Sequence, residues 1–258
     1  GLRRIDAVPA ILDAAEEADP RIRAAALLAL GATVGPENLD YLIARVVSPR
    51  HVQETKVARQ ALLAAAVRMP DCDACAEQLA GSMSQAPLQV QIALLEVLGA
   101  VGGGRSLAVV AAAAKDKNPR LQDNASRLLG QWMTADAAPV LLELAQTAAS
   151  DKYRVRSLRG YIRIARQFSM PDDERAEMCR TALLTASRDD EKKLVLVVLE
   201  RYPNMDMFKL AVEAIKDPSL KNDAEKIAMA GSAAEASELV GELNTLAQAL
   251  LAGIDAND

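Results

Sequence analysis

The stretch DPRIRAAALLALGATVG, from Asp19 to Gly35, predicts how the whole chain folds. Asp19 can cap a helix, and Pro20 suits the first helical position, where its missing N–H costs no hydrogen bond. Gly31 lies near the expected end of the same helix, where glycine is a common stop signal. The stretch therefore predicts one short helix with its own start and stop.

Apolar residues inside this stretch recur at spacings of three and four, which place side chains on one face of a helix. They are Ile22, Ala26, Ala29 and Leu30. We expect that face to be buried against other helices.

Versions of the stretch return roughly every 30 to 38 residues as far as Gly231, which is the signature of a repeat protein. The closest copies begin at Asn118 and at Asp217, and a weaker copy begins at Asp151, expected there as a helix cap. Counted from their prolines, Ile22, Leu121 and Leu220 share one register position, and Ala26, Ala125 and Ala224 share another. Because they share register positions, we expect these residues to occupy equivalent packing positions in each repeat.

The recurring pattern is Asp-Pro-x-apolar-Arg, then alanine one turn later, then Leu-Gly. It resembles the HEAT family, in particular the bacterial HEAT-like repeats first associated with phycobilisome lyases. The copy at Asp19 meets the pattern in full and the copy at Asn118 nearly so. The resemblance implies an all-α fold, an α-α superhelix (HEAT-like α-solenoid) of about seven antiparallel helix pairs plus a C-terminal capping helix.

We expect residues 1–258 to form a single HEAT-like repeat domain. The expected repeats are roughly 5–35, 36–69, 71–102, 103–134, 136–168, 171–202 and 203–231, with a capping helix at 234–252. An open solenoid needs such a cap because its last repeat would otherwise expose an apolar edge.

Composition narrows the class of protein and of partner. Of 258 residues, 51% are hydrophobic and 25% charged, which excludes disorder. A net charge of −5 argues against attraction of the whole surface to nucleic acid or to an anionic membrane. No apolar run approaches the roughly 20 residues of a membrane span. The chain begins at Gly1 without a signal-peptide pattern, so we expect it to be part of a larger chain, and three scattered cysteines favour a cytoplasmic location.

The strongest candidate site is an arginine stripe in the helix expected after Asp151. Arg156, Arg159, Arg163 and Arg166 fall within roughly 80° of one another on a helical wheel. The HEAT resemblance would place them in the concave groove, joined by Lys152, Arg120 and Arg127. Two interpretations stay open: the stripe binds an acidic ligand through the paired donors of arginine, or it pairs with acidic residues of neighbouring repeats such as Asp123, Asp189 and Asp190.

Other motifs are weaker. Cys72 and Cys75 have the spacing of a metal or redox pair, but the single histidine, His51, lies in another repeat, so we expect small buried helix residues and no metal. The glycine run Gly102–Gly104 lacks the rest of a phosphate-binding loop and predicts a turn between hairpins. Trp132 and Phe208 are expected to pack between hairpins.

These observations favour a noncatalytic scaffold that binds a protein or acidic peptide in its concave groove, without a cofactor. One histidine cannot supply the repeated His-Glu pairs of the di-iron hydroxylases that share this fold. A bilin-lyase-like or DNA-glycosylase-like enzyme and a nucleic-acid-binding scaffold are the alternatives, and the low aromatic content, 3%, counts against both enzymes.

Overall fold

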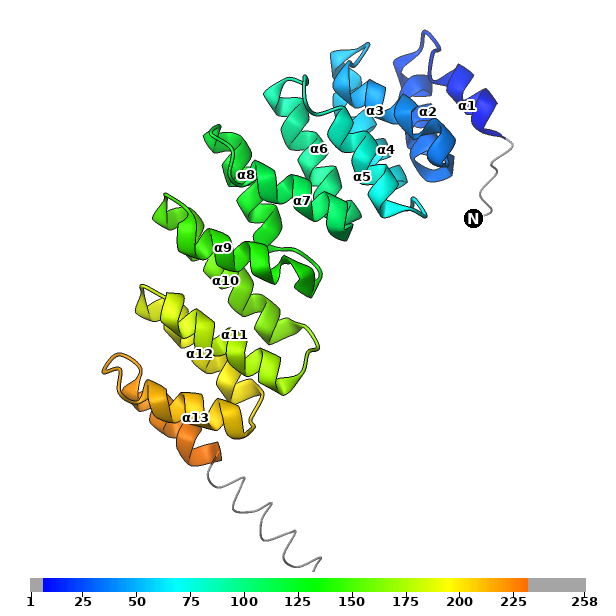
Figure 1. Ribbon diagram of the computed structural model, residues 1–258. Coiled ribbons are helices and arrows are strands. Elements are labelled where there is room, and N and C mark those ends of the chain that lie inside the picture. The colour runs from blue at the N-terminus through cyan, green and yellow to red at the C-terminus, as the bar shows by residue number, and fades with distance from the viewer. Residues whose placement is uncertain (1–6, 232–258) are drawn as a thin grey trace, which may run out of the picture.

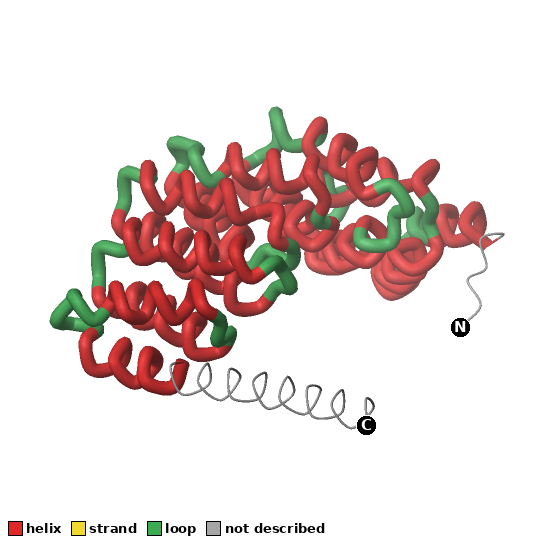
Figure 2. The backbone as a smooth tube through the Cα atoms, turned by 60° about the horizontal axis from the view of Figure 1, so that its bottom comes forward, coloured by secondary structure: helices red, strands yellow, loops and turns green. Residues whose placement is uncertain are grey.

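The computed structural model describes residues 7–231, and throughout this range the chain is helical with no strand. Consecutive helices fold back on one another as hairpins, which stack side by side into a curved array (Figure 1). Short turns join the helices, as Figure 2 shows. The predicted all-α solenoid is confirmed.

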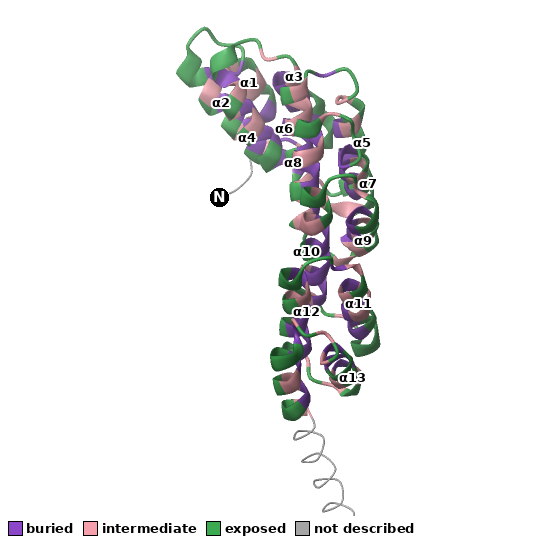
Figure 3. Ribbon diagram, turned by 90° about the vertical axis from the view of Figure 1, so that its left-hand side faces the viewer, coloured by how far each residue is buried: buried purple, intermediate pink, exposed green. Residues whose placement is uncertain are grey.

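The helices form two layers, which Figure 3 shows edge-on. The outer layer consists of α1 (Val8–Ala14), α3 (Leu39–Val47), α5 (Cys72–Gly81), α7 (Gly103–Ala113), α9 (Ala138–Thr147), α11 (Asp172–Thr185) and α13 (Met205–Ala214). The inner layer consists of α2 (Pro20–Thr33), α4 (Thr55–Ala66), α6 (Leu88–Val101), α8 (Pro119–Gly130), α10 (Asp151–Gln167) and α12 (Asp189–Arg201), followed by the helical residues 221–231. Short 3₁₀ turns precede three of these helices, at Pro36–Asn38, Val52–Glu54 and Ala135–Ala137.

Neighbouring inner helices pack directly on one another from α2 through to α12. In the outer layer the closest approaches join α5 to α7 and α11 to α13. A single hydrophobic core runs between the layers from Val8 to Ala228. The inner layer is therefore the more continuous of the two.

The capping residues of the repeat pattern act as predicted at two helix starts, and a third forms the same bond in the turn before residues 221–231. Asp19 and Asn118 each accept a hydrogen bond from the backbone N–H two residues on, at 2.8 and 3.0 Å. Asp217 accepts the equivalent bond from Ser219 at 3.0 Å. Asp151 differs: it is the first residue of α10, after Ser150, and pairs with Arg154. The prediction of a cap at Asp151 was wrong because the helix begins one residue earlier than the register implied.

The register of alanines is confirmed, because Ala26, Ala125 and Ala224 are all buried. The neighbouring register position is not uniform. Leu121 and Leu220 are buried, whereas Ile22 is 46% exposed. The buried face of α2 is made instead by Arg23, Ala26, Leu27, Leu30 and Gly31. The face predicted for this helix was thus rotated by about one residue.

Gly31 does not end its helix, since α2 continues to Thr33. A β-carbon at Gly31 would lie 2.7 Å from the backbone of Ala61 in α4. A β-carbon at Gly160 would similarly lie 3.0 Å from the Cα of Gly130, between α10 and α8. Gly31 and Gly160 therefore permit close approach of a neighbouring inner helix, which spacing within one helix does not reveal.

The expected capping helix at 234–252 lies outside the described residues. Among residues 7–231, no helix is both long and apolar enough to cross a bilayer. The division of the chain into one domain of seven repeats stays a prediction.

Candidate functional site

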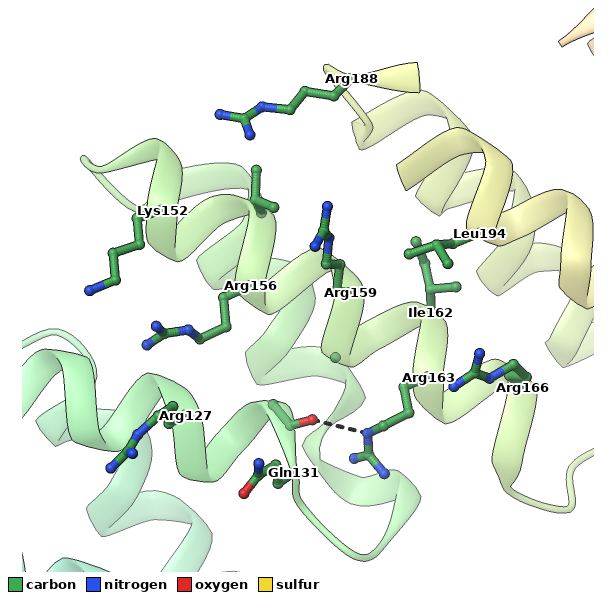
Figure 4. A pocket seen from close by; sticks show the side chains of 13 residues that line it. Arg127, Gln131, Lys152, Arg156, Arg159, Ile162, Arg163, Arg166, Arg188 and Leu194 are labelled. Atoms are coloured by element: carbon green, nitrogen blue, oxygen red, sulfur yellow. Dashed lines mark hydrogen bonds between the residues drawn. The ribbon is translucent and has the colours of Figure 1, made fainter. Parts of the chain in front are cut away.

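A pocket of about 570 Å³ lies between α8, α10 and the start of α12 (Figure 4). Its cationic lining residues are Arg127, Lys152, Arg156, Arg159, Arg163, Arg166 and Arg188. No lining residue is acidic, and none comes from an outer helix. The pocket therefore opens on the face of the inner layer that points away from the outer helices, and we call it the cationic pocket.

Helix α10 presents its arginines to this pocket because its apolar residues face the core. Leu158, Tyr161 and Ala165 are buried in that core. Arg159 is exposed, and the three other arginines of the stripe are half-buried. The sequence pattern thus placed the stripe on the correct side of the helix.

Arg156 is held by the preceding inner helix. It donates to the Asp123 carboxylate at 2.9 Å and to the Ser126 hydroxyl at 2.7 Å. Lys152 shares the same carboxylate at 2.6 Å. The hydrogen bond from Lys152, and then that from Arg156, lowers the pKa of Asp123. The predicted counter-charge Asp123 is therefore present, and it joins α8 to α10.

Arg159 is held by the following inner helix, through a residue that sequence reasoning missed. It donates to Glu191 of α12 at 2.8 Å. The Glu191 side chain is 1% exposed, and its second carboxylate oxygen has no hydrogen-bond partner among the described residues. The expected counter-charges Asp189 and Asp190 form no ion pair within residues 7–231. The helical turn of α12 directs Glu191, and not its two acidic predecessors, toward α10.

Arg163 caps the end of α8. It donates to the carbonyl of Gly130 at 3.0 Å and to that of Trp132 at 2.5 Å, and its third bond goes to Gln167. A cation is favourable there because the last carbonyls of a helix carry partial negative charge. Burial, and then the charge of Arg166, lowers the pKa of Arg163.

Arg166, Arg127 and Arg188 are different, because none of the three side chains forms a hydrogen bond or ion pair within the described residues. They come from α10, from α8 and from the turn that precedes α12, and all three line the pocket (Figure 4). The charge of Arg188 reaches Asp151, which Arg154 already neutralises. Of the predicted stripe, only Arg166 thus has no partner for its side chain in the part of the chain that the structure describes.

The residues that line the cationic pocket could be predicted only in part from the sequence. Lys152 and Arg127 line it as expected, whereas Arg120 does not. Arg188 was missed because it lies in a turn, outside any helical periodicity. Apolar side chains complete the lining at Val155, Ile162 and Leu194.

The weaker motifs have structural roles or none. Cys75 is buried, and burial, followed by the charge of Cys72, raises its pKa to about 11, which disfavours a reactive thiolate. Cys72 is exposed, so the expectation that both cysteines are buried was wrong for it. Residues 7–231 contain no cluster of three or more potential metal ligands. Gly102 and Gly103 form a turn at positive φ, and Trp132 is buried, as predicted.

Comparison with known families agrees with this geometry. The family profile for HEAT repeats matches residues 76–159. Those residues belong to the HEAT repeat family. The matched HEAT segment includes α8 and the stripe residues Arg156 and Arg159, so one wall of the cationic pocket is built from it. A search of curated proteins returned no match to the chain.

HEAT repeats generally serve as protein-interaction scaffolds, because stacked hairpins create long continuous surfaces. Fold alone does not identify a partner, which must be argued from the residues of a site.

Proposed function

We propose that this chain is a noncatalytic HEAT-type scaffold that binds an acidic segment of a partner protein in the cationic pocket, on the concave face of its inner layer. The proposal rests on one observation above all: seven cationic side chains line the pocket, and among residues 7–231 only two carboxylates, Asp123 and Glu191, pair with them. Such a surplus of positive charge repels itself unless a counter-charge is bound.

The apolar lining favours a peptide over other anions. Val155, Ile162 and Leu194 lie beside the arginines, so an occupant gains from carrying apolar side chains next to its acidic ones. No aromatic side chain lines the pocket on which a nucleic-acid base could stack. These features support an acidic peptide over single-stranded nucleic acid.

The test compares binding of a short labelled peptide of glutamate and leucine with that of its lysine counterpart. We expect the wild-type protein to bind the glutamate peptide alone, with affinity that falls as salt rises. Arg166→Ala with Arg188→Ala should weaken binding without lowering the melting temperature, because neither side chain has a structural partner within the described residues.

The matched control is Arg21→Ala with Arg105→Ala, which removes the same charge from α2 and α7, away from the pocket. If both double variants lost the same amount of binding, the loss would be explained by the change in net charge and not by the pocket. Equal binding of both peptides by the wild-type protein would contradict the proposal.

A further inference from the structure

The three pocket arginines whose side chains have no partner among residues 7–231 differ from the rest of the pocket in how they are arranged. Arg127, Arg166 and Arg188 belong to three separate elements, namely α8, α10 and the turn before α12. Figure 4 shows them on different sides of the pocket, with Arg166 extending toward Arg163. An occupant that pairs with all of them must accept hydrogen bonds from several directions.

The other arginines of α10 cannot easily turn to a ligand. Removing Arg159 from Glu191 would leave a buried carboxylate without any partner. Turning Arg163 away would free the last carbonyls of α8, and Arg156 is fixed by Asp123 and Ser126. These contacts hold the pocket in shape and leave Arg127, Arg166 and Arg188 to contact the ligand.

We infer that the cationic pocket recognises a phosphoryl group carried on the bound protein segment, an inference that rests on the function proposed above. A phosphoserine or phosphothreonine carries a charge of about −1.5 to −2 and three acceptor oxygens in a tetrahedral array. A carboxylate carries a single charge and two oxygens in one plane, which one guanidinium can satisfy. The phosphoryl group therefore suits better than a carboxylate the surplus of charge and of donors that Arg127, Arg166 and Arg188 supply.

Binding of three peptides that differ at one position tests the inference: phosphoserine, glutamate or serine, flanked by the same leucines. The phosphoserine peptide should bind about tenfold more tightly than the glutamate peptide, since charge-assisted bonds to phosphate oxygens are more numerous. In Arg166→Ala with Arg188→Ala the two affinities should become nearly equal, whereas Arg21→Ala with Arg105→Ala should keep the preference.

Inorganic phosphate supplies the second arm, because a free phosphate offers the same oxygens without the peptide. It should compete only weakly, since it cannot contact Val155 or Leu194. Phosphate that binds as tightly as the phosphopeptide would overturn the assignment to a protein segment.

The remaining outcomes separate the two proposals. Equal affinity for the phosphoserine and glutamate peptides would overturn the phosphoryl inference and leave the acidic-segment scaffold standing. Failure of all three peptides to bind would overturn both.

Discussion

Close contact between inner helices depends on single glycines. Gly31 is the clearest case, because backbone atoms of Ala61 occupy the space that a side chain at Gly31 would need. Backbone atoms cannot rotate away as the end of a side chain can. Gly31→Ala should therefore force α2 and α4 apart and lower the free energy of unfolding by about 1–3 kcal/mol. Urea denaturation followed by circular dichroism measures the change.

Gly81 provides the control for this substitution. It also lies in a helix, α5, but a β-carbon there would have no neighbour within 4 Å. Gly81→Ala should be neutral or stabilising by up to about 1 kcal/mol, because alanine favours helix. If both substitutions have the same effect, the close approach of α2 to α4 is not what Gly31 provides.

Ala125 tests the register shared by the repeats. It is completely buried in α8, so Ala125→Leu should overpack the core and cost about 1–3 kcal/mol. Ala112, exposed on α7, takes the same substitution as a control. A thermal melt of the Ala125→Leu protein that matches the wild type would contradict the position of α8 in the core.

Residue-level predictions succeeded where the cause was local. The caps at Asp19 and Asn118 depend on backbone groups two residues away, and the alanine register depends on crowding that recurs in each repeat. Ile22 failed because the buried face of α2 is rotated by about one residue, toward Arg23 and Leu27, which spacing within one helix does not fix. Arg23 likewise is buried against Glu54, 31 residues on in the chain, which no spacing rule indicates.

Between elements, ion pairs tie successive inner helices together, and one of them predicts a pH dependence. The hydrogen bond from Lys192 of α12, and then those from Ser219, lower the pKa of Asp217 to about 2. Folding therefore favours the charged carboxylate. The resulting stabilisation should be complete above about pH 4 and should disappear as the pH falls to about 2.

Asp217→Asn isolates this contribution, because asparagine retains the cap, as Asn118 shows in its own repeat, but loses the charge. The variant should be less stable than the wild type at neutral pH, and the difference should vanish in acid. Denaturant unfolding at a series of pH values measures both. A difference that persists unchanged down to about pH 2 would assign the effect to the cap and not to the ion pair.

Arg159 and Glu191 connect α10 to α12. Arg159→Ala should cost about 1–3 kcal/mol, because it leaves a buried carboxylate unpaired. Glu191→Gln in the same chain should recover part of the loss, since a neutral amide is less costly to bury. Additive effects of the two substitutions in a double-mutant cycle would show that the side chains do not interact in solution.

Those features of the candidate site that lie within one helix could be predicted, whereas contacts between helices could not. Helical periodicity grouped the four arginines of α10, but which of them are paired depends on α8 and α12. Glu191 could not be told apart in the sequence from the neighbouring acidic residues Asp189 and Asp190. Only the orientation of α12 about its axis shows which of the three faces α10. Arg188 carried no signal, because a turn has no periodicity.

For the whole molecule, the stacked arrangement predicts that damage stays local. Among the described residues, the main contacts of helix α2 are with α1, α3 and α4, as expected where each repeat packs on its neighbours. Gly31→Ala should therefore increase backbone hydrogen exchange in α1 to α4 and leave α11 to α13 unchanged. Exchange measured by mass spectrometry would contradict this if protection fell equally along the array.

The glycine contacts also have a mechanical consequence. When a beam bends, one plane within it, the neutral plane, keeps its length while the rest stretches or compresses. The backbones at Gly31–Ala61 and Gly130–Gly160 already lie too close to admit a β-carbon, so they resist being pressed closer. We therefore expect the neutral plane to lie nearer the inner layer, so that bending changes the spacing of the outer helices more than that of α8 and α10, which carry Arg127 and Arg166.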